Sequence, residues 1–225
     1  MSWSIPIPAG EEHQQERERF KNAIGEASRK RRLMFCSSPD IGQFTDDTYP
    51  SVIERGSLFR IGAAHDDGTP FSYAGKNVDY IFPGVKVSSQ APPGSRQPPR
   101  DITGSSVATA LAAGLAATII YCFKASVLAY KVARAHKNVP DTLPSAPLIE
   151  QDIRNIMEHP AMKTAFSKIG AVNDGGFIQV WDLFEPVSQI LADPKTSHEE
   201  QVKSIVELCS KLKDWGQGLR GARMI

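Results

Sequence analysis

The longest apolar stretch of the chain runs from 107 to 123, where seventeen consecutive residues carry no charge. A helix that is apolar on every side must be buried, either in a large core or in a membrane. Small residues keep this helix thin, so that neighbouring elements can approach its backbone: Ala108, Ala112, Ala113, Gly114, Ala116 and Ala117. The pattern therefore predicts a central helix around which the other elements pack.

The first third of the chain alternates between strand and helix patterns. A short β-type run at 2–7 precedes an amphipathic helix at 11–32, and the apolar run 33–36 reads as a buried strand. A strand, a helix and a strand within about thirty residues predict a βαβ unit and a parallel sheet. With further strands expected at 57–64 and 78–82, the predicted fold class is α/β, a mostly parallel sheet with flanking helices.

Helical patterns dominate the end of the chain. They cover 148–169, 177–191 and 197–215, and the segment Ser197–Glu200 has the residues of a capping box. Three prolines fall within 138–147, which predicts a linker. We therefore expect a first domain at 1–137, the linker at 138–147, and a helical extension at 148–225 whose Gly- and Arg-rich tail is disordered.

The composition and net charge argue against several classes of function. The 225 residues have a formal net charge of +1, which argues against a broad nucleic-acid surface. The cysteines Cys36, Cys122 and Cys209 have no metal-ligand or disulfide-framework spacing, so we expect neither a metal nor a cofactor. The N-terminal ten residues lack the basic region and apolar core of a signal peptide, which favours an intracellular location over secretion.

Candidate chemistry lies at the start of the apolar helix, in Gly104, Ser105 and Ser106. A hydroxyl in the first turn of a helix lies near unpaired backbone N–H groups and the positive end of the helix dipole. That position suits a nucleophile whose reaction generates an oxyanion. The residues alone leave a second interpretation open, in which both serines only cap a core helix.

The segment that starts at Gly104, G-S-S-V-A-T-A-L-A-A-G, resembles the nucleophile motif of the subtilisin-like serine peptidases, G-T-S-x-A-x-P-x-x-A-G. The resemblance implies that Ser106 is the nucleophile, that Gly104 forms the turn before it, and that Gly114 is a close helix-packing position. Ala110 stands where the family usually has proline, and Leu111 where it usually has histidine. Neither departure touches the reacting atom.

Four more segments resemble this family in the family's order. Ser2, Trp3 and Ser4 look like the strand that pairs with bound substrate. The segment S-S-P-D-I-G at 37–42 resembles the loop A-A-G-N-x-G. Its first three residues, Ser37, Ser38 and Pro39, would line the specificity pocket, and Asp40 takes the place of the oxyanion-hole asparagine. The segments at 48–52 and 56–84 resemble the Y-P-S-V and V-G-A regions that follow.

Asp40 is a consequential departure from that motif. An asparagine side chain offers N–H donors, whereas an ionised aspartate offers only acceptors and would repel an oxyanion. Losing one such donor costs about 3–4 kcal/mol of transition-state stabilisation. Asp40 is thus expected to weaken the oxyanion hole, unless the segment is only a surface Pro-Asp turn.

The sequence contains no motif that would supply a general base for the serine. A serine needs a base and an orienting carboxylate, which subtilases carry in D-[ST]-G and H-G-T motifs before the serine; neither occurs here. The segment from His65 to Thr69 contains His and Asp, but its D-G pair between two β-type runs indicates a turn. The other histidines, His13, His136, His159 and His198, read as surface residues. The chain resembles the C-terminal part of the peptidase domain.

Three functions follow from these sequence features, in order of preference. The first is a subtilisin-like serine endopeptidase that acts on peptide or protein substrates, in a truncated form that lacks the Asp and His of the triad and whose missing half-domain is a possible partner. The second is a non-catalytic remnant that binds an extended peptide by β-augmentation. The third, a membrane anchor at 107–123, is disfavoured because the run is short for a ~20-residue span and rich in alanine.

Overall fold

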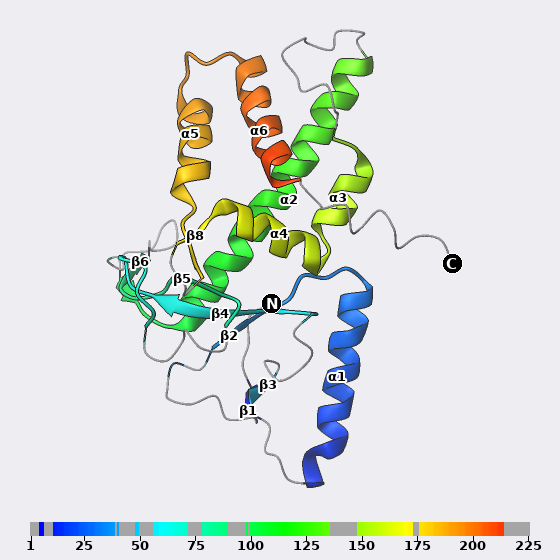
Figure 1. The fold of residues 1–225 in the computed structure, drawn as a ribbon, viewed down its shortest axis with the longest axis vertical. Coiled ribbons are helices and arrows are strands. Elements are labelled where there is room, and N and C mark those ends of the chain that lie inside the picture. The colour runs from blue at the N-terminus through cyan, green and yellow to red at the C-terminus, as the bar shows by residue number, and fades with distance from the viewer. Residues whose placement is uncertain are drawn as a thin grey trace. The chain divides into compact units, whose positions relative to one another are not determined.

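The structure is a computed structural model, and it describes residues 5–6, 11–38, 40, 48–49, 56–71, 78–89, 98, 100–135, 148–172 and 176–213 (Figure 1). The chain divides into two compact units. The first comprises Met1–Leu115 and Ala171–Ile178, and the second comprises Ala116–Gly170 and Gln179–Ile225. The expected linker at 138–147 and the expected disordered tail lie outside the described residues, so the division at these positions stays a prediction.

The main sheet of the first unit has five strands in the order β2-β4-β5-β9-β8. Their bounds are Phe35–Ser37 for β2, Phe59–Ala64 for β4, Tyr80–Pro83 for β5, Ala171–Val172 for β8 and Phe177–Ile178 for β9. Strands β2, β4, β5 and β9 are parallel, and β8 is antiparallel to β9. Every residue of β4 is buried, as expected for an inner strand of a parallel sheet. The predicted α/β class with a mostly parallel sheet is confirmed.

The predicted first βαβ unit is wrong. Strand β1 (Ile5–Pro6) pairs antiparallel with β3 (Thr48–Tyr49) in a separate two-stranded sheet, so it does not join β2. The strand pattern at 2–7 could be read from the sequence, but its partner could not, because pairing depends on contacts across more than forty residues of chain.

The amphipathic helix is confirmed as α1 (Gln14–Arg29), which follows a single 3-10 turn, η1 (Glu11–His13). It buries Ile24 against the first strands of the sheet, in a cluster with Met34, Cys36 and Leu58, and Phe20 and Ala27 pack on this cluster. Aromatic rings extend the core across the strands: Phe35 stacks on its register partner Phe59 with ring centroids 5.1 Å apart. The buried residues of this unit thus form one cluster between α1 and the first strands and a second one, of Ala64, Ile81 and Phe177, farther along the sheet.

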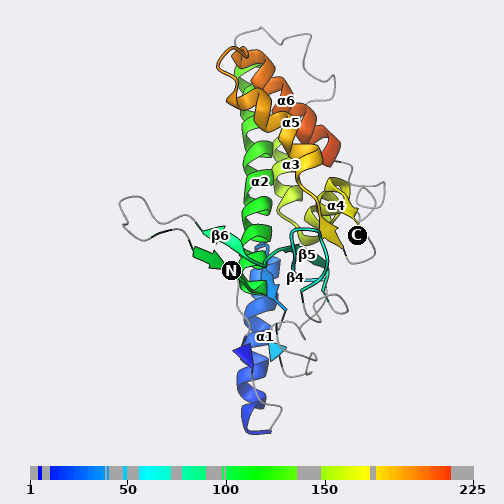
Figure 2. The same ribbon diagram turned by 90° about the vertical axis from the view of Figure 1, so that its left-hand side faces the viewer.

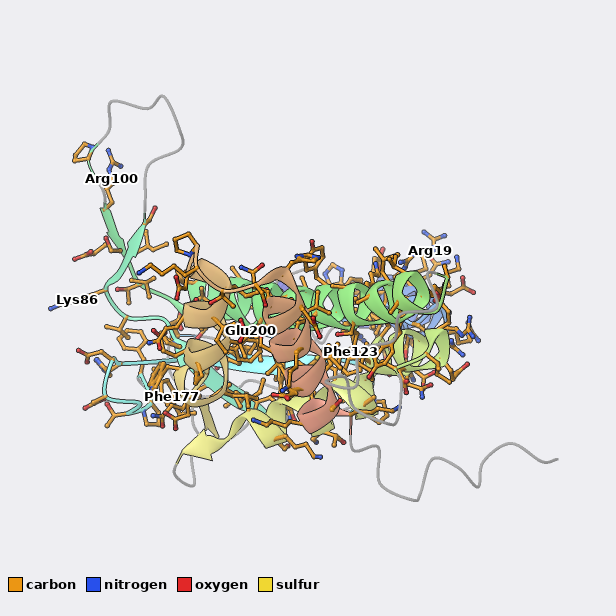
Figure 3. The ribbon with its side chains drawn as sticks, turned by 90° about the horizontal axis from the view of Figure 1, so that it is seen from above. Arg19, Lys86, Arg100, Phe123, Phe177 and Glu200 are labelled. Carbon is orange, nitrogen blue, oxygen red and sulfur yellow. The ribbon has the colours of Figure 1, made fainter. Side chains whose placement is uncertain are left out.

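A hairpin precedes the long helix. Strands β6 (Val87–Ser89) and β7 (Arg100–Ile102) pair antiparallel and project from the sheet (Figure 2). The stretch 90–103 is rich in proline, glycine and serine, a composition that predicts a loop, and β7 shows that its end forms a strand instead. Figure 3 shows Arg100 on this hairpin and Lys86 just before it, both pointing away from the neighbouring elements.

The central helix is α2 (Ser105–Ala135). The expectation that it is buried on every side is wrong: Ala108, Ala112 and Ile119 are fully buried, but Tyr121 is 72% and Leu128 61% exposed. Within the described part of the chain, α2 is the one helix long and apolar enough to cross a membrane, and 33% of its most apolar window is buried. Core helices of soluble proteins can have the same length and composition, so the absence of a membrane span stays a prediction.

The second unit is helical. Besides the C-terminal part of α2 it contains α3 (Glu150–Ile156), α4 (His159–Ile169), α5 (Trp181–Ala192) and α6 (His198–Leu212). The pattern at 148–169 predicts one helix, but the structure divides it into α3 and α4, and Pro160 lies in the first turn of α4, where proline is favoured. The pattern from 177 also starts later than predicted, since Phe177 is buried in β9. The capping box of Ser197 and Glu200 is confirmed.

Candidate active site

The turn before α2 is connected by hydrogen bonds to the ends of two parallel strands, β4 and β5. The Gly84 N–H donates to the Ala64 carbonyl at 3.0 Å, and the Gly104 N–H donates to the Gly84 carbonyl at 2.8 Å. A Cβ on Gly84 would lie 2.6 Å from the Cβ of Ala63 and 3.0 Å from the Gly104 carbonyl oxygen, so this approach requires glycine. The start of α2 therefore lies at the carboxyl ends of β4 and β5.

Ser105 is fully buried and links three segments of chain. Its hydroxyl accepts a hydrogen bond from the Ala63 N–H in β4 at 3.2 Å and donates one to Asp40 Oδ1 at 2.6 Å. The sequence predicts Ser105 only as a possible cap. The sequence signal for Ser105 is that the G-S-S segment carries a hydroxyl in addition to that of Ser106. Its hydrogen-bond partners are seen only in the structure.

Asp40 lies at the N-terminus of α2, although 65 residues of sequence separate it from Ser105. Both of its carboxylate oxygens accept from the Ser105 N–H, Oδ1 at 3.0 Å and Oδ2 at 3.1 Å. A carboxylate in this position satisfies an unpaired N–H of the first turn and interacts favourably with the helix dipole. The carboxylate thus caps α2.

Ser106 follows in the first turn, and its side chain is exposed, in contrast to Ser105. Gly104 has a φ of +149°, and a Cβ built on it would lie 3.3 Å from Asp40 Oδ2 and 3.4 Å from Ser106 Oγ. The two oxygens therefore flank the side of Gly104 that lacks a side chain. An exposed hydroxyl, a carboxylate and the N-terminus of α2 lie together at this glycine.

The other predicted site residues are partly described. Ser37 ends β2, while Ser38 is 4% exposed and donates its N–H to the Ile61 carbonyl at 2.7 Å. Gly114 is exposed, and a Cβ added to it would meet nothing within 4 Å. Ser2, Trp3, Ser4 and Pro39 lie outside the described residues. The substrate-binding and packing roles stay predictions.

Among the described residues, no histidine is hydrogen-bonded to Ser106. In the described residues, the Ser106 hydroxyl makes no hydrogen bond, and no group of three His, Cys, Asp or Glu side chains could hold a metal ion. His65 begins the predicted turn, which is confirmed: its carbonyl accepts from the Gly68 N–H at 3.1 Å, and Gly68 has a φ of +81°. The histidine ring stacks edge-on against Phe71.

Comparison with known proteins finds similarity at the level of structure alone. No family model and no curated protein matches the chain. The solved patellamide maturation protease PatG is 19% identical, with a TM-score of 0.46, and the match covers 72% of this chain and 46% of that one. The PatG macrocyclase in complex with peptide is 17% identical, with a TM-score of 0.44 and coverages of 96% and 51%.

A third similar structure is the prenylagaramide maturation protease PagA, at 15% identity and a TM-score of 0.40, covering 85% of this chain and 55% of that one. These neighbours are subtilisin-like protease domains. The chain spans about half the length of the solved proteins that it resembles.

Proposed function

We propose that this chain carries the nucleophile side of a subtilisin-like serine endopeptidase. In this proposal the Ser106 oxygen attacks a peptide carbonyl carbon as its proton passes to a histidine from another segment, and the carbonyl oxygen becomes an oxyanion near the first turn of α2. The histidine gives the proton to the leaving amine as the acyl-enzyme forms, and water then hydrolyses the acyl-enzyme. The observation that carries the proposal is the meeting of Asp40, Gly104 and Ser106 at one point, in support of the motif order. The serine that the motif selects is also the exposed one of the pair.

We propose further that the isolated chain turns over little or no substrate. A serine hydroxyl stays protonated at neutral pH without a base, and the chain lacks the D-[ST]-G and H-G-T motifs. A second polypeptide segment must then supply the histidine and its aspartate. Without these, only the contribution of binding and the oxyanion hole remains, about 10³–10⁴-fold over the reaction in water.

The second candidate is a peptide-binding remnant without catalysis. The observation that favours it is Asp40 itself, because its charge lies beside the position where an oxyanion would develop and its oxygens already accept from Ser105. Such a protein would bind peptide substrates with the same affinity whether or not Ser106 carries a hydroxyl.

The test combines labelling, turnover and complementation. Residues 1–225 and the variants Ser106→Ala and Ser105→Ala are treated with a serine-directed fluorophosphonate and assayed on peptide substrates, alone and mixed with the Asp- and His-bearing half of a related subtilase. We expect weak labelling and no turnover alone, and turnover that depends on Ser106 in the mixture. Turnover that persists in Ser106→Ala would contradict the assignment. Peptide binding with no turnover in any mixture would favour the second candidate.

A further inference from the structure

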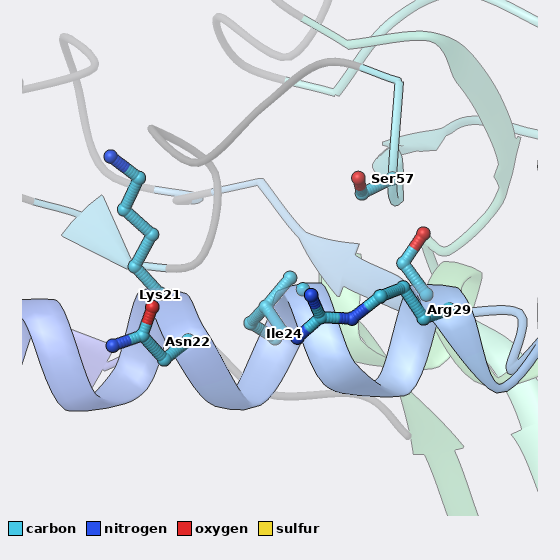
Figure 4. A pocket seen from close by; sticks show the side chains of 7 residues that line it. Lys21, Asn22, Ile24, Arg29 and Ser57 are labelled. Atoms are coloured by element: carbon cyan, nitrogen blue, oxygen red, sulfur yellow. The ribbon is translucent and has the colours of Figure 1, made fainter.

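A hollow of about 350 Å³ lies beside the C-terminal half of α1, away from the serine site (Figure 4). Lys21, Gly25, Ser28 and Arg29 line it from the helix, and Ser57 lines it from the turn before β4. Its volume is in the lower part of the range found for small-molecule sites, about 300–1,000 Å³. The proposed peptidase chemistry makes no use of it.

The hollow has an apolar floor. Ile24 lines it and is 5% exposed, since the same side chain packs into the core cluster with Met34 and Leu58. A ligand with an apolar body can cover the small part of Ile24 that remains exposed and remove its own apolar surface from water.

The rim of the hollow is basic. Lys21 and Arg29 both line it, and none of the described residues that line it is acidic. They are eight positions apart on the helix, or about 12 Å along its axis. Arg29 also pairs with the exposed Glu26 at 3.2 Å, whereas Lys21 has no ionic partner among the described residues. Figure 4 shows the Arg29 guanidinium turned back along α1 towards Ile24, and the Lys21 ammonium at the other end.

Gly25 keeps the hollow open. It lies in the interior of α1, where glycine destabilises a helix relative to alanine, and a Cβ added to it would meet nothing within 4 Å. No neighbour among the described residues therefore requires glycine at this position for steric reasons. A longer side chain here would fill the space between Lys21 and Ser28.

We propose that this hollow is a binding site for a small ligand that carries an anionic group, a carboxylate or a phosphate, on an apolar body. The anionic group pairs with Lys21 or Arg29, because charge-assisted hydrogen bonds to these side chains are the strong ones. The Ser28 and Ser57 hydroxyls add hydrogen bonds, and the apolar body lies on Ile24. The proposal does not depend on the peptidase assignment.

The test is an NMR titration of the isotope-labelled full chain with three compounds of similar shape: N-acetylphenylalanine, its neutral carboxamide and phenyl phosphate. We expect saturable shifts of the backbone amide signals of Lys21–Arg29 and Ser57 with at least one anion, and binding of the carboxamide about tenfold weaker than that of the acid. The stronger of the two anions identifies the headgroup. If neither anion gives saturable shifts, or if the acid and its carboxamide bind equally, the proposal is wrong.

Matched variants locate the site. Lys21→Ala should weaken binding of the anion about tenfold, while Lys30→Ala, which removes an exposed cation of the same region that does not line the hollow, should leave it unchanged. Gly25→Leu should abolish binding, whereas Ala23→Leu adds the same side chain at an exposed position outside the hollow and should not. If the anion binds the two leucine variants with equal affinity, it binds elsewhere on the chain and the assignment of the hollow is wrong.

Discussion

The Ser105 hydroxyl donates a 2.6 Å hydrogen bond to the Asp40 carboxylate, and the Ser105 N–H donates to both oxygens of the same group. One buried serine thereby fixes an acidic side chain at the positive end of α2. The negative charge lies beside the exposed Ser106, where an acyl-transfer site would place a hydrogen-bond donor. In the proposed reaction, helix capping by Asp40 and binding of the oxyanion would compete for the same first turn.

Replacing the two adjacent serines by alanine should have very different effects on stability. Ser105→Ala removes the hydroxyl that Asp40 Oδ1 shares with the Ser105 N–H and leaves the buried Ala63 N–H without its partner, and a buried polar group left unsatisfied costs about 1–3 kcal/mol. Ser106→Ala alters an exposed side chain and should change the free energy of unfolding by no more than about 0.5 kcal/mol. Urea denaturation of both variants measures the difference. Equal losses would show that the Ser105 hydrogen bonds contribute nothing.

Asp40→Asn should lower the stability of α2 and at the same time remove the charge that would repel an oxyanion. The amide oxygen can still accept from Ser105, but the charge at the helix N-terminus is lost, which should cost about 0.3–1 kcal/mol. In the complementation assay the new N–H donor should raise Ser106-dependent turnover above that of the original chain. Asp67→Asn, in an exposed turn, serves as the control for a lost charge. If Asp40→Asn turns over substrate no faster than the control, Asp40 does not lie at the oxyanion position.

Two glycines of the serine motif should respond to alanine with opposite signs. Gly104→Ala forces a side chain into a φ of +149° and within 3.4 Å of Asp40 and Ser106, which should destabilise the protein by about 1–3 kcal/mol. Gly114→Ala adds a Cβ in open space inside a helix and should stabilise it by about 1 kcal/mol. Thermal or urea unfolding of the pair reports the sign. Destabilisation by Gly114→Ala would point to a packing role for Gly114 after all.

The ion pair between Arg60 and Asp79 should be sensitive to the loss of one partner. Asp79 Oδ2 accepts from the Arg60 N–H at 2.9 Å and from its Nε at 3.3 Å, and the two side chains are only 8% and 12% exposed. Asp79→Ala leaves a buried guanidinium unpaired and should cost about 3–5 kcal/mol. The double variant Arg60→Met, Asp79→Leu should cost much less, because no charge remains buried. A double-mutant cycle measures the coupling, and additive single effects would contradict it.

The buried thiols should make stability depend on alkaline pH. Burial raises the pKa of Cys36 and of Cys209 from 9.0 to about 12, since a thiolate is poorly solvated in the core. The unfolded chain then releases these protons at lower pH than the folded one, so their contribution is complete below pH 9 and is lost between pH 9 and 12. The slope should reach about 1.4 kcal/mol per pH unit for each thiol.

Variants and alkylation separate the thiol effect from other alkaline titrations. Cys36→Ala should flatten the pH dependence of the unfolding free energy between pH 9 and 12, after correction for the cost of the cavity. At pH 8 iodoacetamide should modify the half-buried Cys122 before Cys36 and Cys209, which are buried. Mass spectrometry of a short alkylation pulse gives the order. Rapid modification of Cys36 would show that its strand opens readily.

Local patterns were enough to predict much of the fold. The apolar face of α1, the buried run of β4 and the Ser197 capping box each depend on residues a few positions apart, so their periodicity and end signals can be read along the chain. The same holds for the turn from His65 to Thr69, which its Asp-Gly pair specifies. Motif order likewise singled out Ser106, but its catalytic role stays a prediction.

Contacts between distant residues could not be read in this way. The sequence placed Asp40 beside the serine only through a resemblance, and it contained no sign that Ser105 would take both carboxylate oxygens across 65 positions. The partner of β1 and the strand at Phe177 were missed for the same reason, since pairing is a long-range choice. Hydrophobicity predicted α2 as a helix, but which of its sides is buried depends on the elements that pack against it, and an apolar composition does not specify them.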